Sequence, residues 1–364
     1  MKYIEQYRNT EKQKEIIKEI HKYGKLINRN VNIMEVCGTH TMIIGKYGIR
    51  KLMPENINLI SGPGCPVCVT PINYIDTAIE LSKIKDVIIV TFGDMMKVPG
   101  SFSSLEKEKA NHAEIFVVYS PIDALKIAQD NKDKKVIFLS VGFETTTPLI
   151  AQTLKISKEK NIKNFYILAG NKLIPPVMEF LLREKDTEID GFICPGHVSV
   201  IIGLSNYISI SERFNVPCVI SGFEPFDILL SIYLILKSIK ENDCKVINEY
   251  KRTVRENGNI KARKVMYEVF DVVDDEWRGI GLVKNSGLKP KDEFLDFDAE
   301  KKFKIINKNS KEKKECLCGE VLKGKKSPFD CPLFEKICNP ENPYGPCMVS
   351  SEGTCSAYYK YERK

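Results

Sequence analysis

Cys37 lies in the segment Cys37-Gly38-Thr39-His40-Thr41, which directly follows the apolar run NIMEV. Gly38 lets a ligand approach the backbone closely, and the neighbouring threonines and His40 supply hydrogen-bond donors around the thiol. A cysteine beside an imidazole and exposed amides is a candidate for a lowered thiol pKa, and therefore for a nucleophile or metal ligand. The alternative is a buried cysteine that packs as a small apolar side chain beside a packed histidine.

A second pair of thiols, Cys65 and Cys68, lies in the glycine- and proline-framed run GPGCPVC, directly after a predicted strand. Two thiols at this spacing can form a reversible disulfide or hold one metal ion. No second CxxC lies nearby to complete a four-cysteine zinc site, which favours redox chemistry or an open metal position. A structural zinc half-site shared with the tail of the chain is the alternative.

Three further loops carry polar residues after predicted strands, in GDMM, GFETTTP and CPGH. Their chemistry would come from Asp94, Glu144 and His197, which suit acid–base or ligand-orienting roles. Thr145–Thr147 ahead of Pro148 also fit an ordinary helix N-terminus, with proline in the first turn.

The tail holds six of the twelve cysteines within 40 residues and no histidine. They are Cys316, Cys318, Cys331, Cys338, Cys347 and Cys355. An all-thiolate set suits a [4Fe–4S] cluster held by four cysteines, and a four-cysteine zinc site is the alternative, because spacing alone does not separate the two. Four ligands leave two cysteines, which could pair as a redox disulfide near the cluster.

The elements that position these residues alternate along the chain. Short β-branched runs such as Val87–Phe92 and Val136–Val141 alternate with helical patterns such as Tyr74–Ile84 and Thr147–Lys158. This alternation predicts an α/β fold with two related parallel-sheet domains that face a cleft, followed by a smaller C-terminal cysteine-rich domain, for which an iron–sulfur cluster and a zinc site both remain open. We place the first α/β domain at residues 1–120, the second at 121–244 and the C-terminal domain at 245–364. Loops after parallel strands meet at one sheet edge, so the motifs should converge there.

Composition excludes several classes of protein. With 43% hydrophobic residues the 364-residue chain can bury real cores. The longest strongly apolar stretch, Ile228–Leu236, is about half of the ~20 residues that a membrane helix needs, and the charged N-terminus lacks a signal-peptide core. The net charge of +7 comes from lysines spread along the chain without interleaved aromatic residues. We therefore expect a cytoplasmic protein that binds neither nucleic acid nor membrane.

Taken together, the motifs resemble those of the hydrogenase maturation protein family HypD. The matching runs are MEVCGTHT, SGPGCPVCVTP, TFGDMMKVPG, VGFETTTP, CPGHVSVIIG and CPLFEKICNPENPYGPCMVSSEGTC. They follow the family order from residue 34 to 355 and so cover nearly the whole chain.

The resemblance implies a scaffold that binds Fe(II) carrying CN and CO ligands and assembles the Fe(CN)2CO unit of [NiFe]-hydrogenases. It implies a HypC-type chaperone as partner, a HypE-type cyanide donor and, indirectly, the hydrogenase large subunit. Cys37 would be the iron-binding thiolate and His40 would line its site. Cys65 and Cys68 would pass electrons or anchor the iron further. The tail would hold the [4Fe–4S] cluster, with Cys331 and Cys338 the most favoured ligands.

Two other classes fit parts of the same pattern. A cluster-linked thiol–disulfide oxidoreductase would use Cys65 and Cys68 on a disulfide substrate. A non-catalytic assembly protein would bind zinc instead of iron. The hypothesis of a hydrogenase maturation protein predicts an assembly scaffold with redox chemistry. It does not assign a turnover reaction to the protein.

Overall fold

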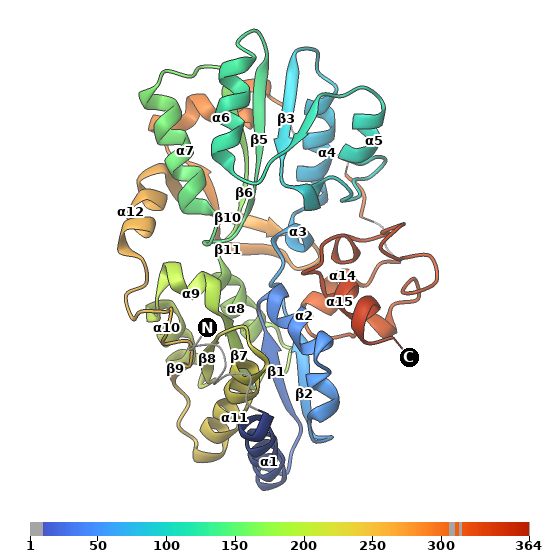
Figure 1. Ribbon diagram of the computed structural model, residues 1–364, viewed down its shortest axis with the longest axis vertical. Coiled ribbons are helices and arrows are strands. Elements are labelled where there is room, and N and C mark those ends of the chain that lie inside the picture. The colour runs from blue at the N-terminus through green and yellow to red at the C-terminus, as the bar shows by residue number, and fades with distance from the viewer. Residues whose placement is uncertain (1–9, 306–309, 313–314, 364) are drawn as a thin grey trace.

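Two parallel β-sheets form the two lobes of the computed structural model, which describes residues 10–305, 310–312 and 315–363 (Figure 1). The five-stranded sheet has the order β2-β1-β7-β8-β9, and the four-stranded sheet has the order β4-β3-β5-β6. Every neighbouring pair within these two sheets is parallel. Parallel strands require crossover connections, and here helices supply most of them.

The strands of the two sheets are short and, for the most part, buried on both faces. The five-stranded sheet consists of β1 (Val31–Glu35), β2 (Ile57–Ser61), β7 (Gly191–Pro195), β8 (Cys218–Ser221) and β9 (Val246–Asn248). The four-stranded sheet consists of β3 (Val87–Thr91), β4 (Ile115–Val117), β5 (Lys135–Gly142) and β6 (Phe165–Asn171). Every residue of β3, β6, β7 and β8 is buried, as expected when helices cover both sides of a parallel sheet.

Helices cover both lobes. Around the five-stranded sheet lie α1 (Thr10–Ile27), α2 (Gly38–Lys46), α9 (Gly196–Ile202), α10 (Ser205–Phe214) and α11 (Pro225–Glu241). The four-stranded sheet is packed by α3 (Pro66–Val69), α4 (Ile72–Ser82), α5 (Leu105–Ala110), α6 (Pro121–Asp130), α7 (Thr147–Glu159) and α12 (Ile260–Val269). The chain returns from β6 to β7 through α8 (Ile174–Arg183). Among these described helices, none is long and apolar enough to cross a membrane.

The C-terminal part adds a hairpin and a compact tail. The antiparallel hairpin of β10 (Phe270–Trp277) and β11 (Gly281–Pro290) packs against β6 and α8. The tail carries α13 (Ala299–Phe303), α14 (Cys318–Leu322) and α15 (Thr354–Tyr361), with short 3-10 turns η5 (Pro328–Asp330) and η6 (Pro346–Met348). Figure 1 shows α14 and α15 beside the junction of the two lobes, where α15 packs on α2.

The predicted fold class is confirmed: two parallel-sheet lobes precede a cysteine-rich C-terminal region. The sheets are not divided at residue 120, however. Strands β1 and β2 pair with β7 to β9, whereas β3 and β4 pair with β5 and β6. The predicted ranges 1–120 and 121–244 therefore each contribute strands to both sheets, and β9 extends the first sheet past residue 244. Hydrophobic pattern identifies a strand but does not identify its neighbour, which explains the difference.

Alternate residues of each strand enter different cores, as the two-residue period of a strand requires. Ile33 of β1 packs with α1 and α11, and Ile88 of β3 packs with α6 and α7. The next residues, Met34 and Ile89, belong to a third core that spans both lobes and continues into the tail. This central core contains most of the cysteines discussed below.

Candidate functional site

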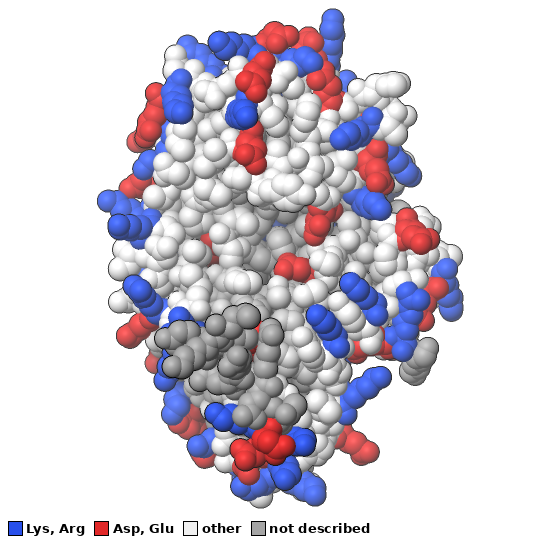
Figure 2. Space-filling view, viewed as in Figure 1, with Lys and Arg blue, Asp and Glu red and all other residues white. Residues whose placement is uncertain are grey.

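A cavity of about 550 Å³ lies between the lobes, at the carboxyl ends of β1, β3, β5 and β7. Figure 2 shows the surface hollowed at this level of the molecule. The residues around the cavity include Cys37, Thr39, Gly64, Asp94, Phe143, Thr145, Thr146, His197 and Glu352. Five of the sequence motifs and one tail residue therefore meet in one place, as open parallel sheets predict for their ligand sites.

Cys37 is the residue directly before α2, and it lines this cavity. The Gly38 amide donates a hydrogen bond to the Gly64 carbonyl (3.1 Å), which joins the CGTH and GPGC loops. Burial raises the pKa of the Cys37 thiol to about 12, and the nearby Glu352 carboxylate adds to the rise, although the amides of His40 and Thr39 oppose it. The expected lowering of this pKa is therefore wrong for the chain alone, because burial outweighs the hydrogen bonds.

His40 lies behind the cavity wall. Its side chain is fully buried and its Nε2 contacts the Gly222 carbonyl (2.9 Å), so this nitrogen carries the proton. Burial lowers the pKa of His40 to about 4. His40 was expected to line the site of Cys37. It is not among the residues that line the cavity, because α2 turns its imidazole toward Gly222.

His197 is the imidazole that lines the cavity. The ring of Phe223 stacks against His197 (centroids 3.9 Å apart) and against His40 (4.9 Å). Burial also lowers the pKa of His197. A neutral imidazole exposed in this cavity can donate or accept a hydrogen bond to a group bound near Cys37.

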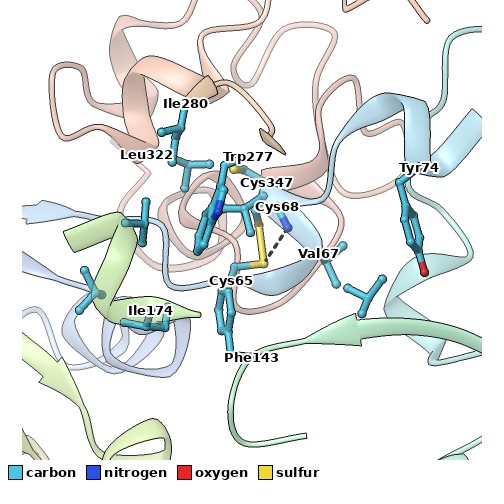
Figure 3. Close-up of a cluster of buried hydrophobic side chains, with 14 of the residues drawn as sticks. Cys65, Val67, Cys68, Tyr74, Phe143, Ile174, Trp277, Ile280, Leu322 and Cys347 are labelled. Carbon is cyan, nitrogen blue, oxygen red and sulfur yellow. Dashed lines mark hydrogen bonds between the residues drawn. A yellow bond between two sulfur atoms is a disulfide. The ribbon is translucent and has the colours of Figure 1, made fainter. Parts of the chain in front are cut away.

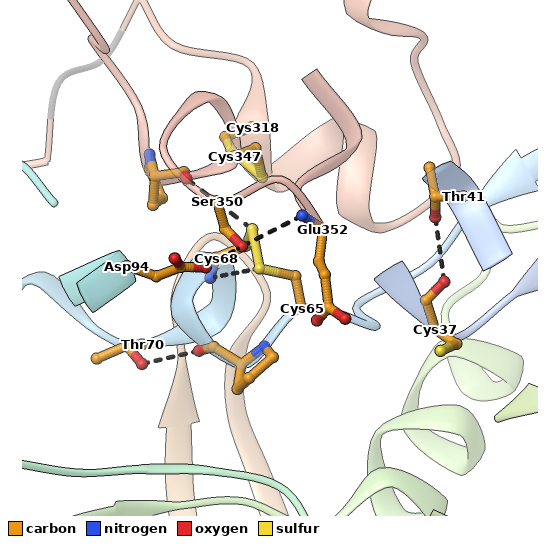
Figure 4. Close-up of a disulfide and its surroundings, with 12 residues drawn as sticks. Cys37, Thr41, Cys65, Cys68, Thr70, Asp94, Cys318, Cys347, Ser350 and Glu352 are labelled. Carbon is orange, nitrogen blue, oxygen red and sulfur yellow. Dashed lines mark hydrogen bonds between the residues drawn. A yellow bond between two sulfur atoms is a disulfide. The ribbon is translucent and has the colours of Figure 1, made fainter. Parts of the chain in front are cut away.

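Cys65 and Cys68 lie behind the cavity wall, joined as a disulfide at the start of α3 (Figures 3 and 4). Cys65 precedes the helix, and its sulfur accepts a hydrogen bond from the Cys68 amide (3.2 Å). Figure 3 shows Trp277 and Phe143 against this pair, and their rings stack with centroids 6.0 Å apart. These rings shield the disulfide from solvent. An external thiol or protein partner therefore cannot contact its two sulfur atoms directly.

All six tail cysteines line a single small, largely apolar pocket. Two of them, Cys318 and Cys347, pair as a second disulfide (Figure 4). The other four remain free thiols: Cys316, Cys331, Cys338 and Cys355. Burial raises the pKa of Cys316 to about 11, and the charges of Cys331 and Cys338 raise it further. Among the described residues, no three His, Cys, Asp or Glu side chains are placed to hold a single metal ion.

The tail pocket and the first disulfide are close neighbours. Cys68 Sγ lies 4.0 Å from the carbonyl oxygen of Pro346, the residue before Cys347. Space around the tail thiols is tight, since a Cβ at Gly345 would fall 2.6 Å from Cys316 Sγ. The two disulfides are thus neighbours in the central core, although Cys68 and Pro346 are 278 positions apart in the sequence.

Two tail residues that the sequence did not single out, Ser350 and Glu352, contact loops of the cavity, and Glu352 also lines it. Glu352 Oε1 accepts a hydrogen bond from Thr39 (2.8 Å), and Asp94 Oδ2 accepts one from Ser350 (2.7 Å). Burial, with the charge of Asp94, raises the pKa of Glu352. The only available signal was their place in the run MVSSEGTC between two cysteines.

Fold and site define an α/β protein with a cleft between two lobes, in which one thiol, Cys37, lines the cleft and the tail thiols line a separate pocket. The model of the HypD family, described as the hydrogenase formation hypA family, matches residues 11–362. A hydrogenase expression/formation protein of Methanocaldococcus jannaschii is 46% identical over 96% of this chain and 97% of its own. The hydrogenase maturation factor HypD of Escherichia coli is 42% identical over 100% of this chain and 99% of its own. The chain belongs to the HypD family of hydrogenase maturation factors.

Proposed function

We propose that the protein, with a HypC-type chaperone, binds iron and assembles the Fe(CN)2CO moiety of the [NiFe]-hydrogenase active site. The observation that carries this proposal is the series of thiols that extends from the cavity between the lobes into the central core and the tail pocket. It begins with Cys37 at the cavity, continues through the pairs Cys65–Cys68 and Cys318–Cys347, and ends at four free thiols. Such a series joins a metal-binding thiol to a source of electrons.

Iron is the cargo of the Cys37 cavity in this proposal. A soft thiolate suits the low-spin ferrous iron that cyanide and CO require. Because burial holds the pKa of Cys37 near 12, iron must displace the thiol proton as it binds. Apolar side chains such as Phe92 and Val141 suit CO, whereas Thr145 and His197 can donate hydrogen bonds to cyanide nitrogens.

The four free tail thiols fit a [4Fe–4S] cluster by the chemistry of their donor set. Four thiolates in an apolar pocket would repel one another without cations. Burial is the main cause of the raised pKa of Cys316, and the charges of Cys331 and Cys338 add to it. When bound, such a cluster would supply electrons one at a time. Cys318 and Cys347 are already paired with each other, which leaves Cys316, Cys331, Cys338 and Cys355 as its ligands.

The two disulfides would connect the tail to the cavity. Reduction of the Cys318–Cys347 disulfide takes up two electrons and two protons. Thiol–disulfide exchange then transfers the two electrons and two protons to the Cys65–Cys68 disulfide, and this exchange needs no further reactant. The contact of Cys68 with Pro346 supports this route. Reduced Cys65 and Cys68 would then keep the iron ferrous or add a thiolate to it.

The partners follow from this role. A HypC-type chaperone would reach Cys37 through the open cavity, and a HypE-type protein would deliver cyanide there. The finished unit would pass indirectly to the [NiFe]-hydrogenase large subunit. The similarity to the E. coli hydrogenase maturation factor HypD supports a role in this pathway.

The first test is infrared spectroscopy of the protein isolated anaerobically with its HypC-type partner, with iron and zinc counted on the same sample. We expect metal-bound CO and cyanide bands in the wild type and in Cys218→Ala, a buried control thiol. Cys37→Ala should lose the bands and keep the fold and the tail iron. Retained Fe–CN bands in that variant would contradict the role of Cys37.

Other outcomes separate the competing functions. Cluster iron without CO or cyanide bands, together with turnover of a generic disulfide, would favour the thiol–disulfide oxidoreductase. A colourless sample with stoichiometric zinc would favour the zinc-binding assembly protein.

A second prediction concerns the tail ligands. Cys331→Ser should remove the visible absorption of the cluster and about four iron atoms per chain, because it deletes one of four proposed ligands. Cys347→Ser should keep both, because Cys347 is a member of the second disulfide. Equal loss of iron in the two variants would contradict this division of the six thiols.

A further inference from the structure

A second cavity of about 730 Å³ lies away from the thiols, between α8, α10, α12 and β11. Its lining includes Glu144, Phe180, Ser209, Tyr267 and Leu282. The GFETTTP loop separates the two cavities: Thr145 and Thr146 line the Cys37 cavity, whereas Glu144 lines this one. The proposed function makes no use of Glu144 or of this space.

Glu144 is an unusual group to find at the wall of a cavity. Its side chain is 1% exposed, and its Oε1 accepts a hydrogen bond from the Ile174 amide (3.0 Å). Its Oε2 is buried and has no hydrogen-bond partner among the described residues. Burial raises the pKa of Glu144 to about 8. Buried polar atoms are almost always paired, so this oxygen calls for a donor that the chain does not provide.

The other charged groups at the cavity do not provide that donor. Arg183 pairs with Glu179 (2.7 Å) and lies over the ring of Phe214, and Arg213 also pairs with Glu179. Lys284 is exposed at the outer edge. Glu184 has only a long contact to Lys325 (3.8 Å). Two carboxyl groups, those of Glu144 and Glu184, are thus left weakly compensated.

Aromatic and apolar side chains complete the lining. Burial raises the pKa of the Tyr267 phenol, and Tyr267 lies close enough to Glu144 for the carboxylate charge to add to the rise. Phe180 contributes a second ring. A carboxylate beside aromatic faces is the arrangement that proteins use to hold organic cations. The apolar wall formed by Pro175, Pro176 and Leu282 would cover the stem of such a ligand.

We propose that this cavity binds an organic cation, an ammonium, amidinium or guanidinium group on an apolar stem, which donates a hydrogen bond to Glu144 Oε2. The cation is either a free small molecule or the lysine or arginine side chain of a partner protein, because both present the same chemistry. Binding places a ligand directly behind the loop that carries Thr145 and Thr146. The inference is independent of the function proposed for the thiols.

Calorimetric titration of the full-length protein with benzamidine tests this site, and benzamide serves as a neutral ligand of the same shape. We expect benzamidine to bind at least about tenfold more tightly than benzamide. Glu144→Gln should lose about tenfold in benzamidine affinity. Glu184→Gln removes the same charge at the outer edge of the same cavity and should change the affinity much less. No binding of benzamidine, equal binding of both ligands, or equal effects of both variants would overturn the proposal.

A second variant keeps the test valid if Glu144→Gln fails to fold. Ser209 lies exposed on α10 and lines the cavity, so Ser209→Trp fills the space without entering the core. It should abolish benzamidine binding and leave the thermal unfolding midpoint unchanged. Undiminished binding in this variant would place the ligand elsewhere and overturn the proposal.

Dependence on pH gives a further readout. Tyr207 of α10 and Tyr267 of α12 are the titratable groups whose electrostatic interactions reach this carboxyl group, and Arg263 of α12 interacts in turn with Tyr267. Both phenols have raised pKa values, so they remain neutral between pH 6.5 and 8.5. Benzamidine affinity should rise over this range as Glu144 loses its proton, and the rise should vanish in Glu144→Gln. A flat wild-type profile would contradict a cation held by this carboxylate.

The source of the cation is decided by two probes that carry the same guanidinium group. Agmatine represents a free small molecule, and a blocked tripeptide with central arginine represents a protein side chain. Binding of agmatine alone would assign a small molecule, whereas binding of both would assign a side chain from a partner. Failure of both would overturn the proposal.

Discussion

Two histidines beside the Cys37 cavity differ sharply in environment although one phenylalanine ring stacks against both. His197 faces the cavity, whereas His40 is fully buried and donates to the Gly222 carbonyl. A buried imidazole held by one carbonyl fixes the start of α2, and with it the position of Cys37 three residues earlier. We therefore regard His40 as a positioning residue and His197 as the group that can contact cargo.

The burial of His40 predicts a pH dependence of stability. Its pKa falls from 6.5 to about 4 on folding, so the unfolded chain binds the proton more tightly and folding is favoured above pH 6.5. This contribution is lost as pH falls from 6.5 toward 4. Between pH 7.5 and 5 the loss is about 2 kcal/mol. Denaturant unfolding of wild type and His40→Gln, which keeps a donor for Gly222, should show the smaller decrease in the variant.

The control for this prediction is His112→Gln, which changes an exposed histidine in the same way. The decrease of stability with pH should be the same in His112→Gln as in the wild type. If His40→Gln also follows the wild-type curve, then His40 is not the group that titrates.

At the scale of elements, close approaches of backbone hold the loops of the cavity together. A Cβ at Gly38 would lie 2.4 Å from the Glu352 carbonyl oxygen, and one at Gly64 would lie 2.2 Å from the Cys37 nitrogen. Neither glycine has a positive φ, so packing and not backbone strain requires it there. The tail loop thus contacts the CGTH loop through a glycine.

Gly38→Ala should consequently displace the tail loop from α2. Overpacking of this kind costs about 1–3 kcal/mol, which urea unfolding would detect as a lower free energy of unfolding. Gly93→Ala is the matched control, because it lies at the same cavity and its Cβ would meet only Val117 at 3.6 Å. Equal stability of the two variants would show that the tail loop adapts without cost.

Much of this arrangement could be predicted from the sequence, and the reasons are local. Buried strands such as β3 and β6 are continuous apolar runs, and the motifs that follow strands meet at one sheet edge. The pairing of β1 with β7 could not be predicted, because it depends on contacts between distant segments. The contact of Glu352 with the cavity could not be predicted either, and nor could the division of the six tail thiols into one disulfide and four free thiols. Neither the spacing nor the composition of the sequence determines which of these side chains meet.

At the scale of the whole molecule, the tail contacts both lobes. Ser350 binds Asp94 beside the four-stranded sheet, and Glu352 binds Thr39 beside the five-stranded one. Farther along, Arg50 pairs with the buried Glu35 of β1 and with Glu362 after α15. The tail therefore fixes the distance between the lobes across the cavity.

Loss of one of these contacts should loosen both loops together. In Ser350→Ala, we expect faster amide hydrogen exchange in residues 93–98 and also in residues 37–41, because one tail loop supports both. Ser209→Ala, on the distant face of α10, should leave both segments unchanged. Faster exchange confined to residues 93–98 would show that the two contacts are independent.

The contact between Thr39 and Glu352 also sets an order of events during synthesis. The two residues are 313 positions apart, so at about 5–20 residues per second the ribosome makes Cys37 roughly 15–60 s before the residue that closes its cavity. Throughout that interval the nascent thiol lacks its tail wall and the proposed electron source. Under the proposed function, iron captured cotranslationally would sit in an incomplete site, so productive loading would have to wait until translation has passed the tail.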